Sequence, residues 1–188
     1  MYDIPAVIFA GGKSSRMGMD KALLPYLEYE TLSEFQYRKL QKYFTSVYLS
    51  SKINKFDFRC ELILDTKDES SPLVALVSIF EQLNIERIFV LSVDAPLIDK
   101  TIIEKLFSND DAYYDATIAK SPRGLQPLCG IYHRSILTKA KVALKNDIHK
   151  LTKLLNESYT HKVPFDKETP FTNLNHKEEY EALLSRKL

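Results

Sequence analysis

The segment from Gly11 to Lys21 (GGKSSRMGMDK) has the composition of an anion-binding loop. Its first two residues, Gly11 and Gly12, allow the backbone to turn sharply and bring its N–H groups close to a ligand. Three cations lie within nine residues of this loop: Lys13, Arg16 and Lys21. A nucleoside triphosphate is a polyanion, and an arginine can bind two of its oxygens at once. The loop therefore predicts a site for the phosphates of a nucleotide.

The spacing of the glycines excludes two common phosphate-binding motifs. A P-loop needs a glycine, four further residues and then Gly-Lys-Ser or Gly-Lys-Thr, and the dinucleotide fingerprint needs Gly-x-Gly-x-x-Gly. Gly11, Gly12 and Gly18 match neither pattern. The alternative is an ordinary glycine turn with a solvated basic rim. The position of the loop, directly after the apolar run 4–10, favours binding, because ligands of open α/β sheets lie beyond the carboxyl ends of the strands.

Asp94 is the strongest candidate for a metal ligand. It directly follows a second apolar run, residues 88–93, so it should lie at the same edge of the sheet as the glycine loop. Mg²⁺ binds one or two carboxylates together with phosphate oxygens and waters. Asp94 is therefore the predicted ligand of an Mg²⁺ cofactor. The alternative is a carboxylate that only caps the turn before Pro96.

These residues need a sheet to position them, and the apolar pattern predicts one. Residues 4–10, 46–51, 61–64 and 88–93 have the character of strands, and amphipathic segments separate them. Ser71-Pro72 and Asp99 are typical helix starts. The alternation predicts an α/β fold: one domain over residues 1–188, a Rossmann-like three-layer sandwich with a mostly parallel, twisted sheet.

The second half of the chain predicts a departure from the parallel pattern. Strands at 112–119 and 126–133, joined by a turn at 121–124, indicate a small antiparallel excursion. Helices at 136–144 and 148–155, a strand at 161–165 and a terminal helix from about residue 177 complete the expected elements.

Composition limits the functional classes. A net charge of +1 argues against a nucleic-acid-binding or polybasic membrane surface, and no apolar run approaches the roughly 20 residues that span a bilayer. Cys60 and Cys129 are too far apart for a disulfide framework or zinc site and are predicted to be buried thiols in a reducing cytoplasm. The four histidines show no ligand spacing, and the basic run at 38–42 is predicted to be a solvated helix face.

Residues 9–24 (FAGGKSSRMGMDKALL) resemble the signature of the molybdenum cofactor guanylyltransferase family, within the GT-A-like nucleotidyltransferases. The resemblance covers nearly the whole chain, most specifically at 4–24 and 90–97. It implies an Mg²⁺-dependent enzyme that transfers GMP from GTP to the phosphate of molybdopterin, the organic part of the molybdenum cofactor, and releases pyrophosphate. GTP and molybdopterin are the implied substrates, and cofactor-delivery proteins or molybdoenzymes are the implied partners.

The loop chemistry and the resemblance together assign the site residues. The expected catalytic residues are Arg16, Lys21 and Asp94. The expected nucleotide-binding residues are Phe9, Ala10, Gly11, Gly12, Lys13, Ser14, Lys21, Asp65 and Asp94. The resemblance implies acceptor binding by Gln126, Asn173 and Asn175. The two asparagines would point the same way in an extended segment, although turn formation before the last helix is an equally good explanation.

The sequence departs from the family pattern at five places, one of which is residues 50–52 (SSK), where the family often has an asparagine. Ser71 and Ala75 replace two glycines, Val93 replaces a common cysteine, and Lys177 replaces a proline. Two rival functions therefore stay open. One is another small-phosphate nucleotidyltransferase, of the sugar-1-phosphate or cytidylyl type, with the same loop. The other is a non-catalytic nucleotide sensor, which would bind the nucleotide without releasing pyrophosphate.

Overall fold

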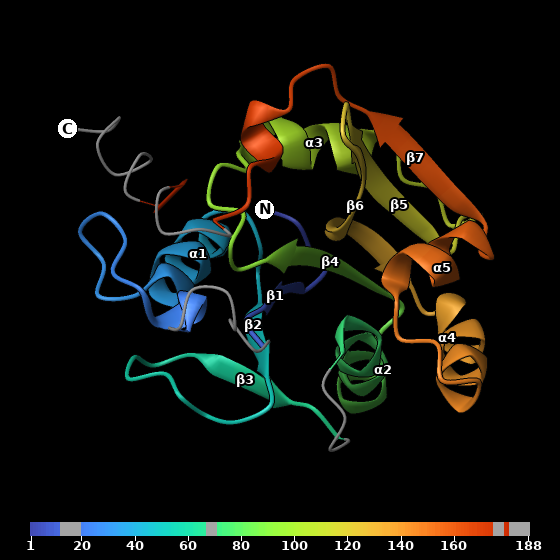
Figure 1. The fold of residues 1–188 in the computed structure, drawn as a ribbon, viewed down its shortest axis with the longest axis horizontal. Helices are drawn as coiled ribbons and strands as arrows, with labels where there is room; N and C mark the ends of the chain where they lie inside the picture. The colour runs from blue at the N-terminus through green and yellow to red at the C-terminus, as the bar shows by residue number, and fades with distance from the viewer. Residues whose placement is uncertain (12–19, 67–70, 175–178, 181–188) are drawn as a thin grey trace.

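The computed structural model describes residues 1–11, 20–66, 71–174 and 179–180. Within these ranges, seven strands form one sheet in the order β3-β2-β1-β4-β6-β5-β7 (Figure 1). The strands are β1 (Ala6–Phe9), β2 (Val47–Ser51), β3 (Glu61–Leu64), β4 (Arg87–Ser92), β5 (Ala116–Ser121), β6 (Gly124–His133) and β7 (Thr160–Pro164). Of these seven, β6 alone runs against its neighbours β4 and β5. The mostly parallel sheet and its antiparallel excursion are thus confirmed.

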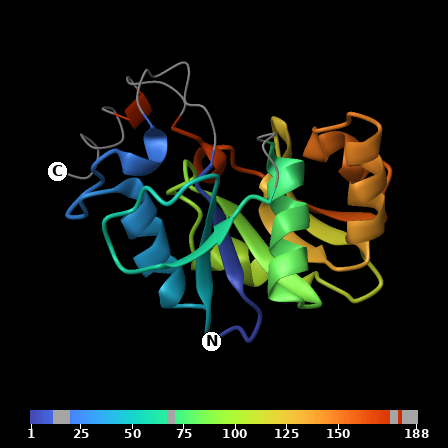
Figure 2. The same cartoon turned by 90° about the horizontal axis from the view of Figure 1, so that it is seen from below.

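Helices cover both faces of the sheet and give the predicted three layers (Figures 1 and 2). One face carries α1 (Leu32–Gln41) and α3 (Lys100–Ser108), and the other carries α2 (Pro72–Leu83), α4 (Ile136–Lys145) and α5 (Leu151–Asn156). Strand β1 is buried on both sides: Ala6 and Ile8 pack in the first core, and Val7 and Phe9 in the second. Period-two alternation in a fully apolar run produces this arrangement.

Helix starts follow the predicted capping chemistry. The side chains of Ser71 and Asp99 accept hydrogen bonds from the N–H groups of Val74 and Ile102, at 3.2 and 3.0 Å. Pro72 occupies the first turn of α2, where its missing N–H leaves no intrahelical bond unmade.

Three local predictions were wrong. Residues 112–115 are not part of β5: the chain turns there, and the Asp115 carboxylate instead accepts hydrogen bonds from Ser135, Lys139 and the backbone N–H of Tyr159. Helix α5 begins at Leu151, three residues later than expected. Cys129 is buried as predicted, but Cys60 is only half-buried.

The order of the strands creates a topological switch point between β1 and β4. From β1 the chain passes outward to β2 and β3, then returns to form β4 on the other side of β1. Phe9 pairs with Ser92, and the N–H of Val93 donates to the carbonyl oxygen of Phe9 at 3.1 Å. The segments that follow β1 and β4 therefore leave the sheet side by side, where ligands of open α/β sheets bind.

Candidate active site

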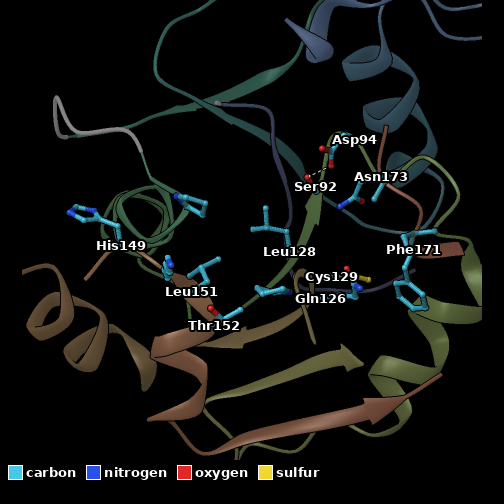
Figure 3. A pocket seen from close by; sticks show the side chains of 15 residues that line it. Ser92, Asp94, Gln126, Leu128, Cys129, His149, Leu151, Thr152, Phe171 and Asn173 are labelled. Atoms are coloured by element: carbon cyan, nitrogen blue, oxygen red, sulfur yellow. Dashed lines mark hydrogen bonds between the residues drawn. The ribbon is translucent and has the colours of Figure 1, made fainter. Parts of the chain in front are cut away.

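Asp94 lies just beyond β4 and is held by contacts with both of its carboxylate oxygens. Oδ1 accepts a hydrogen bond from the Ser92 hydroxyl at 2.6 Å (Figure 3), and Oδ2 lies 3.3 Å from Nζ of Lys21. Both side chains of this ion pair are mostly buried, with 15% of Lys21 and 17% of Asp94 exposed. The structure thus brings together two predicted catalytic residues that are 73 positions apart in sequence.

Strand β1 delivers the first residues of the glycine loop to the same place. Phe9 and Ala10 are buried at the strand end, and Gly11 is exposed. A Cβ added to Gly11 would come no closer than 3.7 Å to its neighbours, so packing does not require a glycine there. The space in front of Gly11 instead suits close approach of a ligand to the backbone. Gly12, Lys13, Ser14 and Arg16 lie outside the described residues.

A cavity of about 400 Å³ opens beside Asp94 (Figure 3). Its wall combines the end of β4 and the turn after it, the middle of β6, the start of α5 and the segment before Leu174. Gln126 and Asn173, two of the three predicted acceptor residues, line this cavity together with Asp94. The backbone N–H of Leu174 donates to the carbonyl oxygen of Asp94 at 2.9 Å, which explains why Asn173 is next to the carboxylate. Asn175 lies outside the described residues.

The cavity also contains polar residues that the sequence did not reveal. His149, Lys150 and Thr152 line it at the start of α5, and Figure 3 shows His149 and Thr152 across the cavity from Asp94. His149 is fixed by Ser71 Oγ, 3.1 Å from Nδ1, and by Asp147 Oδ1, 3.1 Å from Nε2. No motif marks these three residues, because only the packing of α5 against β6 brings them to the pocket. The local signal for a binding role in the sequence was a histidine followed by a lysine at the start of a helix.

Helix α1 (Leu32–Gln41) fixes the segment that carries Asp94. The buried Gln36 amide donates to the carbonyl oxygens of Ser92 and Val93, at 3.3 and 3.2 Å. Nζ of Lys39 donates to the carbonyl oxygens of Pro96 and Ile98, at 3.1 and 3.0 Å. The prediction of a solvated basic face was therefore wrong for Lys39. Its ammonium holds the turn after β4.

Asp65 follows β3 at the same edge of the sheet, and its N–H donates to the carbonyl oxygen of Ser51 at 3.1 Å. Its Oδ1 is buried and has no hydrogen-bond partner among the described residues. Burial raises the pKa of this carboxyl group, and Lys52 opposes the shift. Buried acceptors are normally satisfied, so an open one at a binding edge is available to a ligand's N–H groups.

Cys129 contributes a neutral wall to the cavity rather than a nucleophile. Burial raises the pKa of its thiol to about 12, so the thiolate is not formed near neutral pH. Polar recognition in this cavity therefore depends on the amide, imidazole and carboxylate groups around it.

Residues 6–163 match the family model described as the MobA-like NTP transferase domain. The chain belongs to this family. The matched range of the MobA-like chain contains both sides of the switch point, including Gly11, Lys21 and Asp94, and ends before Asn173.

Similar proteins extend the match to almost the full length of this MobA-like chain. The molybdenum cofactor guanylyltransferase of Campylobacter jejuni subsp. doylei is 40% identical over 187 residues, covering 98% of this chain and 97% of the relative. The protein of the same name from Helicobacter pylori (strain G27) is 34% identical over 185 residues, covering 95% and 90%. The crystal structure of molybdopterin-guanine dinucleotide biosynthesis protein A from Archaeoglobus fulgidus aligns over 97% of both chains, with a TM-score of 0.82 and 20% identity.

Proposed function

We propose that the protein is a molybdenum cofactor guanylyltransferase, which transfers GMP from GTP to the phosphate of molybdopterin and releases pyrophosphate. The observation that carries this proposal is the meeting of Lys21, Asp94 and the end of β1 at the switch point, beside a cavity that contains Gln126 and Asn173. The choice of substrates is supported by the names of relatives that are 40% and 34% identical over nearly the whole chain.

The reaction is an in-line substitution at the α-phosphorus of GTP. An oxygen of the molybdopterin phosphate forms a bond to that phosphorus, and the bond from the α-phosphorus to the bridging oxygen breaks, so that pyrophosphate leaves with the electron pair. A phosphate monoester is largely ionised near pH 7, so the attacking oxygen needs no strong general base. The work of the protein is to position the two substrates and to neutralise charge. Lys21 supplies positive charge, and Gly11 lets the backbone approach the phosphates.

The acceptor is expected in the cavity between Asp94 and α5. Gln126 and Asn173 offer amide donors and acceptors of the kind that a pterin edge requires. His149 and Lys150, on the opposite wall, offer polar contacts to the rest of the acceptor, while its phosphate must lie beside Asp94 to reach the α-phosphorus. The nucleotide is expected on the other side of Asp94, toward Gly11 and Asp65. Asp65 would accept from the N1–H and amino group of guanine.

The residues at the site fit Mg²⁺ as the cofactor. Among the described residues, no three His, Cys, Asp or Glu side chains converge into a metal cage. Asp94 is instead a single carboxylate beside the expected phosphates, which matches the preference of Mg²⁺ for one or two carboxylates with phosphate oxygens and waters. Bound Mg²⁺ would neutralise negative charge on the phosphates. Asp94 would hold it after exchanging its contact with Lys21.

We place the reaction in the cytoplasm, with cofactor-delivery proteins or molybdoenzymes receiving the product. Within the part of the chain that the structure describes, no helix has the length and apolar character that a membrane span requires.

A comparison of nucleotides and acceptors as substrates tests the proposal. Pyrophosphate release is measured with GTP, CTP, UTP and ATP, each with molybdopterin and with a sugar 1-phosphate. The expected result is turnover that is fastest for GTP with molybdopterin. Preferred use of CTP or a sugar phosphate would establish the rival nucleotidyltransferase instead. Nucleotide binding with no pyrophosphate release from any pair would establish a non-catalytic sensor.

A further inference from the structure

Lys55, in the connection between β2 and β3, reaches both ends of the glycine loop. Its Nζ donates to the carbonyl oxygen of Ala10 at 2.9 Å and forms an ion pair with the carboxylate of Asp20. Ala10 precedes residues 12–19 and Asp20 follows them. Only 12% of the Lys55 side chain is exposed, so its charge is largely withdrawn from water and depends on these two partners. The ammonium group of Lys55 thus connects Ala10 and Asp20, the residues on either side of the loop.

Asp20 connects Lys55 to the segment that carries Lys21, the proposed catalytic lysine. Its Oδ1 accepts a hydrogen bond from the N–H of Ala22 at 3.0 Å and caps the short 3₁₀ helix η1 (Lys21–Leu23), while Oδ2 faces Lys55. The carbonyl oxygen of Ala22 is fixed in turn by the buried Ser33 hydroxyl at 2.6 Å. Lys21, the first residue of η1, then lies opposite Asp94. An unbroken series of contacts therefore connects Lys55 to the catalytic carboxylate.

We propose that Lys55 is a positioning residue: it holds the two ends of the phosphate loop together and so fixes Lys21 opposite Asp94. The inference rests on the proposed function, because it assigns the loop to the phosphates of GTP. Because Ala10 and Asp20 are already held in place, less conformational freedom is lost when the phosphates bind beside them. Lys55 is thereby a determinant of triphosphate affinity without itself contacting the nucleotide.

The rival explanation is that Lys55 binds a phosphate directly. The two explanations predict opposite results for Asp20→Asn, an isosteric change that keeps an oxygen for the N–H of Ala22 but removes the charge opposite Lys55. If Lys55 contacted phosphate, the substitution would release its ammonium and remove a negative charge, so GTP would bind more tightly. If Lys55 fixes Ala10 and Asp20, the substitution frees these two flanking positions and GTP binds more weakly.

The experiment compares Lys55→Met, Asp20→Asn and the double variant with wild type. Arg59→Met is the matched control, since it removes one exposed positive charge from the same connection. The dissociation constants of GTP with Mg²⁺ and of guanosine, which has no phosphate, are measured by equilibrium dialysis. Steady-state kinetics gives KM for GTP, and thermal unfolding checks the fold. Asp20→Asn keeps the test valid if Lys55→Met does not fold.

Each single substitution should raise the dissociation constant and KM for GTP about tenfold, in line with the loss of a hydrogen bond to a charged group. Guanosine binding should change less than about twofold. The double variant should be no weaker than either single variant, because both break the same contact. Arg59→Met should match wild type.

Tighter or unchanged GTP binding in Asp20→Asn would overturn the inference, as would additive losses in the double variant. Equal losses for GTP and guanosine would also overturn it, because they would indicate general damage rather than a loosened phosphate loop. Wild-type protein that binds no GTP would refute the proposed function itself. Wild-type binding together with an unaffected Lys55→Met variant would refute the positioning role alone.

Discussion

The packing and hydrogen bonds around Gly11 and Asp65 do not explain why a glycine and an aspartate occupy these positions. A side chain at position 11 would meet only ordinary contacts, and the buried Oδ1 of Asp65 has no partner among the described residues. Core residues are selected by packing, whereas these two positions leave space or a hydrogen-bond acceptor unused. Both lie at the carboxyl edge of the sheet, where the proposed nucleotide would give each of them a role.

Gly11→Ala is expected to separate stability from activity. The added Cβ clashes with nothing and reduces the freedom of the unfolded chain, so the free energy of unfolding should stay level or rise by about 0.4–1 kcal/mol. The methyl group would obstruct the approach of the phosphates, and kcat/KM for GTP should fall roughly a hundredfold. Urea unfolding and steady-state kinetics check the two parts. A stable variant with wild-type kcat/KM would show that the ligand does not approach Gly11.

Asp65→Asn is expected to stabilise the fold and weaken GTP binding. Burial raises the pKa of Asp65, so the folded state disfavours the ionised carboxylate, and this cost appears as the pH rises through its pKa. At pH 8 the variant should therefore gain about 1 kcal/mol, or roughly 2–4 °C in Tm, and at low pH the gain should vanish. Guanine loses its carboxylate partner, so GTP should lose its advantage over ATP. An unchanged preference for GTP would remove Asp65 from the base site.

At the scale of elements, the antiparallel strand β6 is fixed in the sheet at two points along its length. Gly130 lies where a Cβ would come within 2.4 Å of the Thr117 carbonyl oxygen on β5. At the end of β6, His133 contacts the buried carboxylate of Asp110 at 2.9 Å, and Thr117 and Arg87 donate to the same group. Strand β6 carries Gln126, so these features keep one wall of the cavity beside Asp94 in place.

Gly130→Ala is the structural counterpart of Gly11→Ala. The nearest atom is a backbone carbonyl, which can move only if β5 and β6 separate, so we expect a loss of about 1–3 kcal/mol or more in the free energy of unfolding. Urea unfolding measures it directly. If Gly130→Ala were as stable as Gly11→Ala, the close packing of β5 on β6 would be contradicted.

Asp110→Asn should destabilise the protein in a pH-dependent way. Burial raises the pKa of Asp110, but hydrogen bonds from His133 and Thr117 outweigh it, so the pKa lies below its ordinary value. A lowered carboxyl pKa stabilises the fold above the unfolded value of about 3.9, and this contribution disappears as the pH falls through the folded value. The deficit of the variant should be about 1–3 kcal/mol at pH 5, where the Asp110 carboxylate is ionised. It should shrink below about pH 4. Denaturant unfolding across this range checks it, and a deficit that keeps its size in acid would exclude the ionic role.

The sequence predicted the elements that carry their own local signals. Strand β3 matched its predicted limits, and the caps at Ser71 and Asp99 were confirmed, because apolar period and capping chemistry act over a few residues. The sequence-based prediction failed where contacts between residues far apart in the sequence determine the structure. Lys39 looked like a solvated helix residue but reaches Pro96 and Ile98, and His149 reaches the cavity only through the packing of α5. No local pattern contains these contacts.

For the whole molecule, the decisive feature is the return of the chain from β3 to β4 across β1. The sequence placed Gly11 and Asp94 at strand ends, but the pairing of those two strands is a property of the complete sheet. That pairing brings two segments far apart in sequence together, beside the cavity in which the acceptor is proposed to bind. The fold thus explains how residues from positions 9 to 173 come together at the site of the proposed reaction.

The most direct test of this account is the rate of pyrophosphate release from GTP and molybdopterin by Asp94→Ala. Asp57→Ala, which removes an exposed carboxylate from the β2–β3 connection, is the control. The account predicts that Asp94→Ala retains its fold by circular dichroism and loses activity at least about 10³-fold, while Asp57→Ala keeps the wild-type rate. A folded Asp94→Ala protein with wild-type pyrophosphate release would contradict it.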